Sequence, residues 1–158
     1  LSKLAAMGMV FFALALIVTA CGGQAPMVRP TWIEPQVSGT TVSIPVSEVE
    51  KNTMTHFRIP AATGGSLTFM AYKLDGKIQV RADVCPPCRS TSFSLSGDIL
   101  VCDTCSTKFK ATNGEGISGA CVNYPKAAIA YENVNGNMVM NADALVTAYQ
   151  NTIAPGQP

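Results

Sequence analysis

Six cysteines are the residues of this chain whose type and spacing could support chemistry. Four of them form two Cys-x-x-Cys pairs, and the segment between the pairs reads as a hairpin that would bring both to one point. One such bend places two sulfurs close enough for a metal ion, and two bends supply the four ligands of a tetrahedral site. The spacing therefore predicts a metal centre on Cys85, Cys88, Cys102 and Cys105.

The residues leave the occupant of this site open. Thiolates are soft ligands that suit zinc, a single iron or a two-iron cluster. Zinc would have only a structural role, whereas iron would make the protein an electron carrier. The thiols could instead pair as disulfides, which an oxidising compartment permits. A thioredoxin-like redox pair at Cys85 and Cys88 is a further alternative, but the βαβ neighbourhood that it requires is not evident.

Other residues near these pairs carry weaker signals. Cys121 follows Gly119 and Ala120 and is expected either beside the site or as a buried, inert thiol. Pro86 and Pro87 have no N–H, so we expect fewer N–H···S bonds around Cys85 than around Cys102.

The chain lacks the residues of a recognisable catalytic site. His56 is the single histidine, lies in a polar stretch and is expected to be exposed. Because the chain has only one histidine, a two-histidine metal site is excluded, and a Ser–His triad is not supported. With no catalytic base or substrate pocket indicated, we expect an electron carrier rather than an enzyme.

The N-terminal residues predict export and a lipid anchor. Lys3 is followed by an uncharged, mostly apolar run from Leu4 to Ala20, which fits an export signal and is short for a spanning helix. The small residues before Cys21 resemble a bacterial lipobox, so we expect a signal peptide over 1–20 and lipidation of Cys21. An uncleaved anchor helix is the alternative. Either way the domain would sit outside the cytoplasm, tethered to a cell membrane.

The rest of the chain predicts an all-β domain over 39–150. The prolines of 21–38 indicate a partly extended spacer, and 151–158 reads as a loose tail. Short alternating strands and frequent turns favour a small sandwich or barrel. Three hairpins are expected, with turns at 75–76, 96–98 and 135–136. A capping box at Ser47 predicts one helical turn, and Asp143 could cap a helix through Tyr149.

Composition narrows the range of partners. The formal net charge is +1 and charged residues make up 13% of the chain. A nearly neutral domain has no electrostatic footprint for nucleic acid, so no nucleic-acid partner is expected.

From Val84 onward the chain resembles the FtrD-like family of membrane iron–sulfur proteins. The resemblance covers roughly 69–140 and rests on the two Cys-x-x-Cys pairs, Phe109 and the segment from Gly119 to Pro125. It implies an iron–sulfur centre on the four paired cysteines, with Cys121 as the further cysteine of the family motif. It also implies an association with ferrous-iron transport, so a redox or iron-transport membrane protein is the expected partner.

A more distant resemblance is to Rieske domains. The order of features along the chain is the same as in Rieske domains: a strand, a ligand loop, Phe109, a turn and then Ser118-Gly119. Rieske centres use two histidines on one iron, and Cys88 and Cys105 stand where these would be expected. The resemblance implies a Rieske-like fold with a metal-binding double hairpin. The expected function is therefore electron transfer or ferrous-iron handling by an extracytoplasmic iron–sulfur protein, with a zinc-ribbon module or a disulfide-stapled lipoprotein as alternatives.

Overall fold

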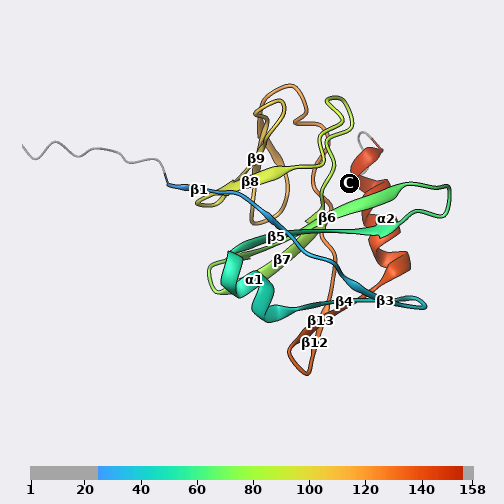
Figure 1. Cartoon of the computed structure of the whole chain (residues 1–158). Coiled ribbons are helices and arrows are strands. Elements are labelled where there is room, and N and C mark those ends of the chain that lie inside the picture. The colour runs from blue at the N-terminus through green and yellow to red at the C-terminus, as the bar shows by residue number, and fades with distance from the viewer. Residues whose placement is uncertain (1–24, 155–158) are drawn as a thin grey trace, which may run out of the picture.

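The computed structural model describes residues 25–154 and shows three β-sheets and two helices (Figure 1). The expected signal peptide and Cys21 lie outside the described residues. Within 25–154 no helix is both long enough and apolar enough to cross a membrane.

The central sheet has the strand order β2-β5-β6-β7. The expected hairpin around Asp75 and Gly76 is confirmed, because β6 and β7 pair from Phe69 with Ala82 to Leu74 with Lys77. The strands are β2 (Thr31–Trp32), β5 (Met54–Pro60), β6 (Ser66–Leu74) and β7 (Lys77–Ala82).

A second sheet has the order β12-β13-β4-β3 and packs with the two helices. The expected hairpin at Asn135-Gly136 is confirmed by the pairing of Val134 with Asn137. The strands are β3 (Gln36–Ser38), β4 (Thr41–Pro45), β12 (Glu132–Val134) and β13 (Asn137–Asn141), and the helices are α1 (Val46–Asn52) and α2 (Ala142–Ile153).

The third sheet carries the second cysteine pair and has the order β1-β8-β9-β10-β11. The expected hairpin joins β8 to β9, and Ser96 pairs with Ile99 across its turn. Cys102 is the last residue of β9. The strands are β1 (Met27–Val28), β8 (Phe93–Ser96), β9 (Ile99–Cys102), β10 (Lys108–Lys110) and β11 (Gly116–Ser118).

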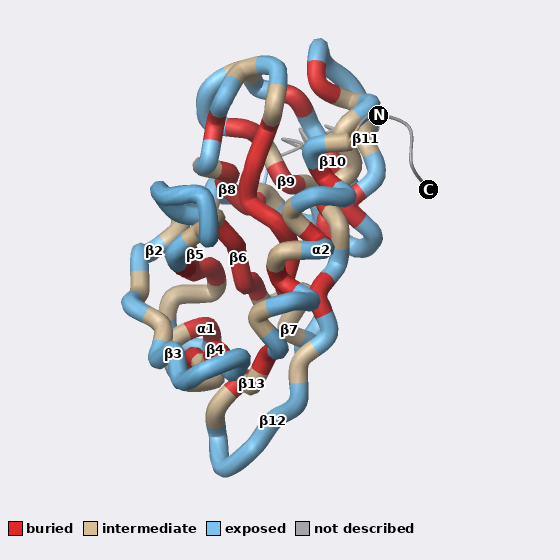
Figure 2. Tube along the Cα trace, turned by 90° about the vertical axis from the view of Figure 1, so that its right-hand side faces the viewer, coloured by how far each residue is buried: buried red, intermediate tan, exposed pale blue. Residues whose placement is uncertain are grey.

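Two hydrophobic cores lie on opposite faces of the central sheet. Along β6, Phe69 and Ala71 belong to the core shared with the second sheet and α2. Met70 and Tyr72 belong to the core shared with the third sheet, as period-two alternation requires. Strand β6 is consequently buried along most of its length (Figure 2). The second core includes three cysteines, Cys85, Cys102 and Cys121.

Regular structure extends beyond the expected domain of 39–150 at both of its ends. Part of the expected spacer forms β1, β2 and β3, which pair with β8, β5 and β4. These strands are only two or three residues long, so they carry no alternation that a sequence pattern could reveal. Helix α2 continues to Ile153, beyond Tyr149 and into the expected loose tail.

The expected helix caps also differ in detail. The N-cap of α1 is Pro45, which makes no side-chain capping bond, so the capping box at Ser47 is wrong. The N-cap of α2 is Asn141 rather than Asp143. Its side-chain oxygen accepts from the N–H groups of Asp143 at 2.8 Å and Ala144 at 3.2 Å.

Candidate metal centre

The two Cys-x-x-Cys loops share one backbone pattern. In each loop the N–H of the first cysteine donates to a carbonyl beyond the second, which ties the ends of the loop together. The residue after the second cysteine has a φ of 58° in both loops, a left-handed conformation that turns the chain back. The tying bonds run from Cys85 to Ser90 over 2.8 Å and from Cys102 to Thr107 over 2.9 Å.

The four paired sulfurs converge on one point. The Sγ atoms of Cys85, Cys88, Cys102 and Cys105 all lie within 4.8 Å of one another. The Sγ atoms of Cys88 and Cys102 are 3.7 Å apart, far beyond a disulfide bond of about 2.05 Å. A tetrahedral ion with metal–sulfur bonds of about 2.3 Å holds its sulfurs about 3.8 Å apart. The thiols, all free in the described residues, are therefore close enough to hold one metal ion and are not joined as cystines.

Each loop contributes one buried and one partly exposed sulfur. Cys85 and Cys102 are 0% exposed and belong to the second core, whereas Cys88 and Cys105 are half-buried at its edge. The site therefore has an inner side enclosed by apolar residues and an outer side near solvent.

Hydrogen bonds to sulfur come mainly from the second loop. Burial raises the pKa of Cys102, although the N–H groups of Cys105 and Thr104 and the Ser90 hydroxyl oppose the rise. Burial also raises the pKa of Cys85, where the interacting groups are thiols and the Lys126 ammonium. This difference agrees with the expectation that prolines in the first loop withhold N–H bonds from sulfur.

Thr107 links Cys105 to the fifth described cysteine. Its Oγ1 lies 3.2 Å from the Sγ of Cys105 and accepts the N–H of Cys121 at 3.2 Å. Burial raises the pKa of Cys105, but the Thr107 hydroxyl and N–H outweigh it and hold the pKa at about 6. The Sγ of Cys121 is 3.7 Å from that of Cys105, and its side chain is buried. Cys121 is thus both buried and beside the site.

His56 is fully buried, so the expectation that it would be exposed is wrong. Its Nδ1 lies 2.9 Å from Oδ2 of Asp83, with both side chains 0% exposed. This contact does not have the geometry of a hydrogen bond, and the polar atoms of the two side chains have no hydrogen-bond partner among the described residues. Burial raises the pKa of Asp83, and the nearby imidazole opposes this rise. The expectation of an exposed His56 rested on its polar neighbours in the sequence. In the structure β2 pairs with β5, and this pairing covers His56.

Sequence reasoning also missed two buried cations. Arg81 on β7 is 2% exposed and Lys126, after the Cys121 loop, is 1% exposed. Lysine and arginine are almost never fully buried unless they are paired, so no local pattern could have identified them.

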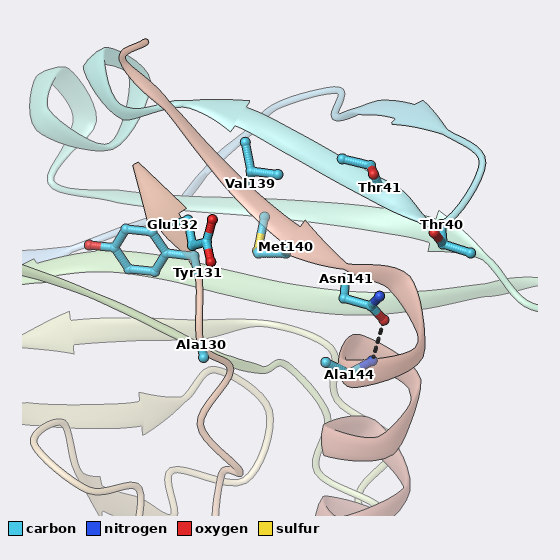
Figure 3. Close-up of a pocket in the computed structure, with 9 residues that line it drawn as sticks. All are labelled: Thr40, Thr41, Ala130, Tyr131, Glu132, Val139, Met140, Asn141 and Ala144. Carbon is cyan, nitrogen blue, oxygen red and sulfur yellow. Dashed lines mark hydrogen bonds between the residues drawn. The ribbon is translucent and has the colours of Figure 1, made fainter. Parts of the chain in front are cut away.

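A shallow groove of about 350 Å³ lies away from the cysteines, between the second sheet and the start of α2 (Figure 3). Its walls include Tyr131, Glu132 and Met140, and the capping bond between Asn141 and Ala144 lies at its edge. It contains no cysteine or histidine, so it adds nothing to the chemistry of the sulfur site.

Comparison with known proteins identifies the family. The family model described as membrane iron-sulfur containing protein FtrD-like matches residues 49–151, more than half of the chain. This match confirms the expected resemblance and the expected iron–sulfur cofactor. The convergent thiols fit such a cofactor, because iron accepts four thiolate ligands. No curated protein matches the sequence.

Two solved structures are similar to the fold. One comes from the complex of reduced oxygenase and oxidized ferredoxin in carbazole 1,9a-dioxygenase, with a TM-score of 0.53 and 17% identity over 66% of this chain and 95% of that one. The other is the Sphingomonas yanoikuyae B1 ferredoxin, with a TM-score of 0.43 and 16% identity over 53% of this chain and 83% of that one. The first likeness confirms the expected all-β, Rieske-like fold.

Proposed function

The chain belongs to the FtrD-like family of membrane iron–sulfur proteins, and on that premise we propose that it is an electron carrier whose iron centre is ligated by Cys85, Cys88, Cys102 and Cys105. The observation that carries the proposal is the convergence of the four sulfurs within 4.8 Å. Among the described residues it is the one cluster of histidine, cysteine or carboxylate side chains with metal-ligand spacing. Soft thiolate ligands favour iron over hard cations.

The burial of the ligands suggests the route of the electron. Cys85 and Cys102 face the core, whereas Cys88 and Cys105 reach toward solvent. A redox partner would therefore approach the outer side, where the iron is nearest to the surface. The centre gains one electron from an external donor and returns it to an acceptor, with no bond made or broken.

Metal analysis and an electronic spectrum test this proposal. Protein purified without oxygen should contain iron and absorb visible light, and dithionite should bleach that absorption. Acid-labile sulfide in equal amount to iron indicates a two-iron cluster, and iron without sulfide indicates a single ion. A colourless protein with one zinc would contradict electron transfer and support a zinc-ribbon module. A metal-free protein without free thiols would support a disulfide scaffold.

Two buried cysteines provide a matched pair of variants. Cys102→Ser should lose the iron and much of the stability, because metal binding and folding are coupled. Cys121→Ser should keep the iron, since Cys121 lies outside the set of four sulfurs. Equal iron content in the two variants would contradict the ligand assignment.

We propose further that a lipid on Cys21 holds residues 39–150 at the outer face of a cell membrane. The apolar run that ends at Cys21 supports an export signal, and the description of the family as membrane proteins agrees with it. Mass spectrometry of the N-terminal peptide should show acyl chains on Cys21. Cys21→Ser should release the protein from membranes, and retention of this variant would contradict the anchor.

The family resemblance also suggests a membrane partner for redox exchange or ferrous-iron transport. Cells without the protein should take up labelled ferrous iron more slowly. The wild-type chain should restore uptake, and Cys102→Ser should not. Equal restoration by both chains would exclude a role of the iron centre in transport.

A further inference from the structure

Two cations are buried in this protein without a carboxylate partner among the described residues. Arg81 donates from Nε to the Tyr72 hydroxyl at 2.8 Å, and from Nη1 and Nη2 to the carbonyls of Lys126 at 2.9 Å and Thr112 at 2.7 Å. All three acceptors are neutral. Asp83 is the one buried carboxylate in the described part, and it pairs with His56.

Of these two cations, Lys126 has contacts that lead to the sulfur site. Its Nζ donates to the carbonyl of Val84, the residue before Cys85, at 2.7 Å. The same Nζ lies 4.3 Å from the ring centre of Phe109 and 5.0 Å from that of Phe93. Phe93 is the cross-strand partner of Cys102, so the ammonium lies next to the residues that hold the inner ligands.

Burial of an unpaired charge costs free energy. One backbone carbonyl and two aromatic rings compensate the Lys126 ammonium only weakly for the water that it loses. The anion that would compensate Lys126 is the thiolate site. Burial lowers the pKa of Lys126, and Cys85, Cys102, Cys121 and Asp83, when ionised, oppose this shift by favouring the ammonium. A centre ligated by four thiolates is anionic, and each electron added makes it more negative.

We propose that Lys126 is the internal counter-ion of the iron centre and that its positive charge favours the reduced form. The inference rests on the proposed ligation by the four thiolates. The redox step remains a transfer of one electron from an external donor to iron, and the ammonium keeps all of its protons throughout. Because Lys126 is buried and its ammonium lies over two aromatic rings, water and salt screen its field less than they would at the surface.

Two neutral variants separate the charge of Lys126 from its hydrogen bond. Lys126→Met removes both, whereas Lys126→Gln can retain a donor for the Val84 carbonyl. Lys108→Met is the matched control, because Lys108 is an exposed lysine on β10, next in sequence to Phe109. Each loaded protein would be titrated with dithionite against redox dyes while its visible spectrum is recorded, and far-ultraviolet circular dichroism would report folding.

Both Lys126 variants should move the redox equilibrium at least tenfold toward the oxidised form, which corresponds to about 59 mV for one electron. Lys108→Met should change the equilibrium less than twofold. A folded Lys126→Gln that fails to load iron would also support the inference, because the anionic centre then needs the cation to assemble. Loaded variants with an unchanged potential would overturn it and leave the proposed ligation intact. An unfolded Lys126→Gln would likewise overturn it, by showing a structural role. A wild-type protein without iron would refute the proposed ligation itself.

Discussion

Gly119 is the position where a single added methyl group should disturb the sulfur site most directly. Its φ is +113°, and a Cβ there would lie 2.6 Å from Oγ1 and 2.7 Å from Cα of Thr107. Thr107 is the residue that contacts Cys105 and holds the N–H of Cys121. Because one of the two crowded atoms belongs to the backbone, rotation of a side chain cannot relieve the clash.

The expected loss of stability in Gly119→Ala has two parts. A non-glycine residue in the left-handed region costs about 1–2 kcal/mol. Overpacking against a fixed neighbour costs about 1–3 kcal/mol more. The sum is about 2–5 kcal/mol. Gly136→Ala is the matched control, because Gly136 has a φ of +80° and a Cβ there would meet nothing within 4 Å. The control should lose only the first part.

Urea unfolding of the two iron-loaded variants, followed by the fluorescence of Trp32, the single tryptophan, measures this difference. With a slope of about 1–3 kcal/mol per molar urea, the midpoints should differ by about 1 M. Unfolding releases the metal, so the variants must be compared at the same free iron concentration. The visible spectrum of Gly119→Ala should also change, because the turn that carries Cys121 moves. Equal midpoints and equal spectra would refute the close packing of Gly119 on Thr107.

Three further predictions follow from the hydrogen bonds. Thr107→Val removes the hydroxyl that stabilises the Cys105 thiolate, so the pKa of Cys105 should rise from about 6 and the reduction potential should fall in a redox titration. Pro87→Gly gives the first loop an N–H, and the potential should rise if that N–H reaches the Cys85 sulfur; an unchanged potential would count against this. Asn141→Ala removes the cap of α2 and should cost about 1 kcal/mol in urea unfolding, with no change in the visible spectrum.

Local signals were sufficient for the parts of the fold that form within a few residues. The turn at Asp75-Gly76 and the turn at Asn135-Gly136 lie between the strands that their neighbours predict. The two Cys-x-x-Cys pairs flank one hairpin, and this spacing alone placed their sulfurs together. These features depend on turn chemistry and ligand spacing, which a sequence records directly.

The features that the sequence did not reveal depend on distant partners. Strand β1 exists because Met27 and Val28 meet Ser96 and Leu95, far along the chain. Lys126 likewise meets aromatic rings on two other strands, so its burial has no local signature. The α1 cap failed for a different reason, because the helix begins one residue before the serine of the expected capping box.

All of the sulfur ligands lie in or beside the second core and none lies in the first. Removal of iron should therefore destabilise the two cores to different extents. Removal of iron takes away the ion that joins the sulfurs beside β8 to β11. The core that contains β4, β13 and α2 keeps all of its apolar contacts. A chelator should therefore leave a partly unfolded chain. Amide protons of β8 to β11 should exchange quickly with solvent, and those of β4, β13 and α2 should remain protected.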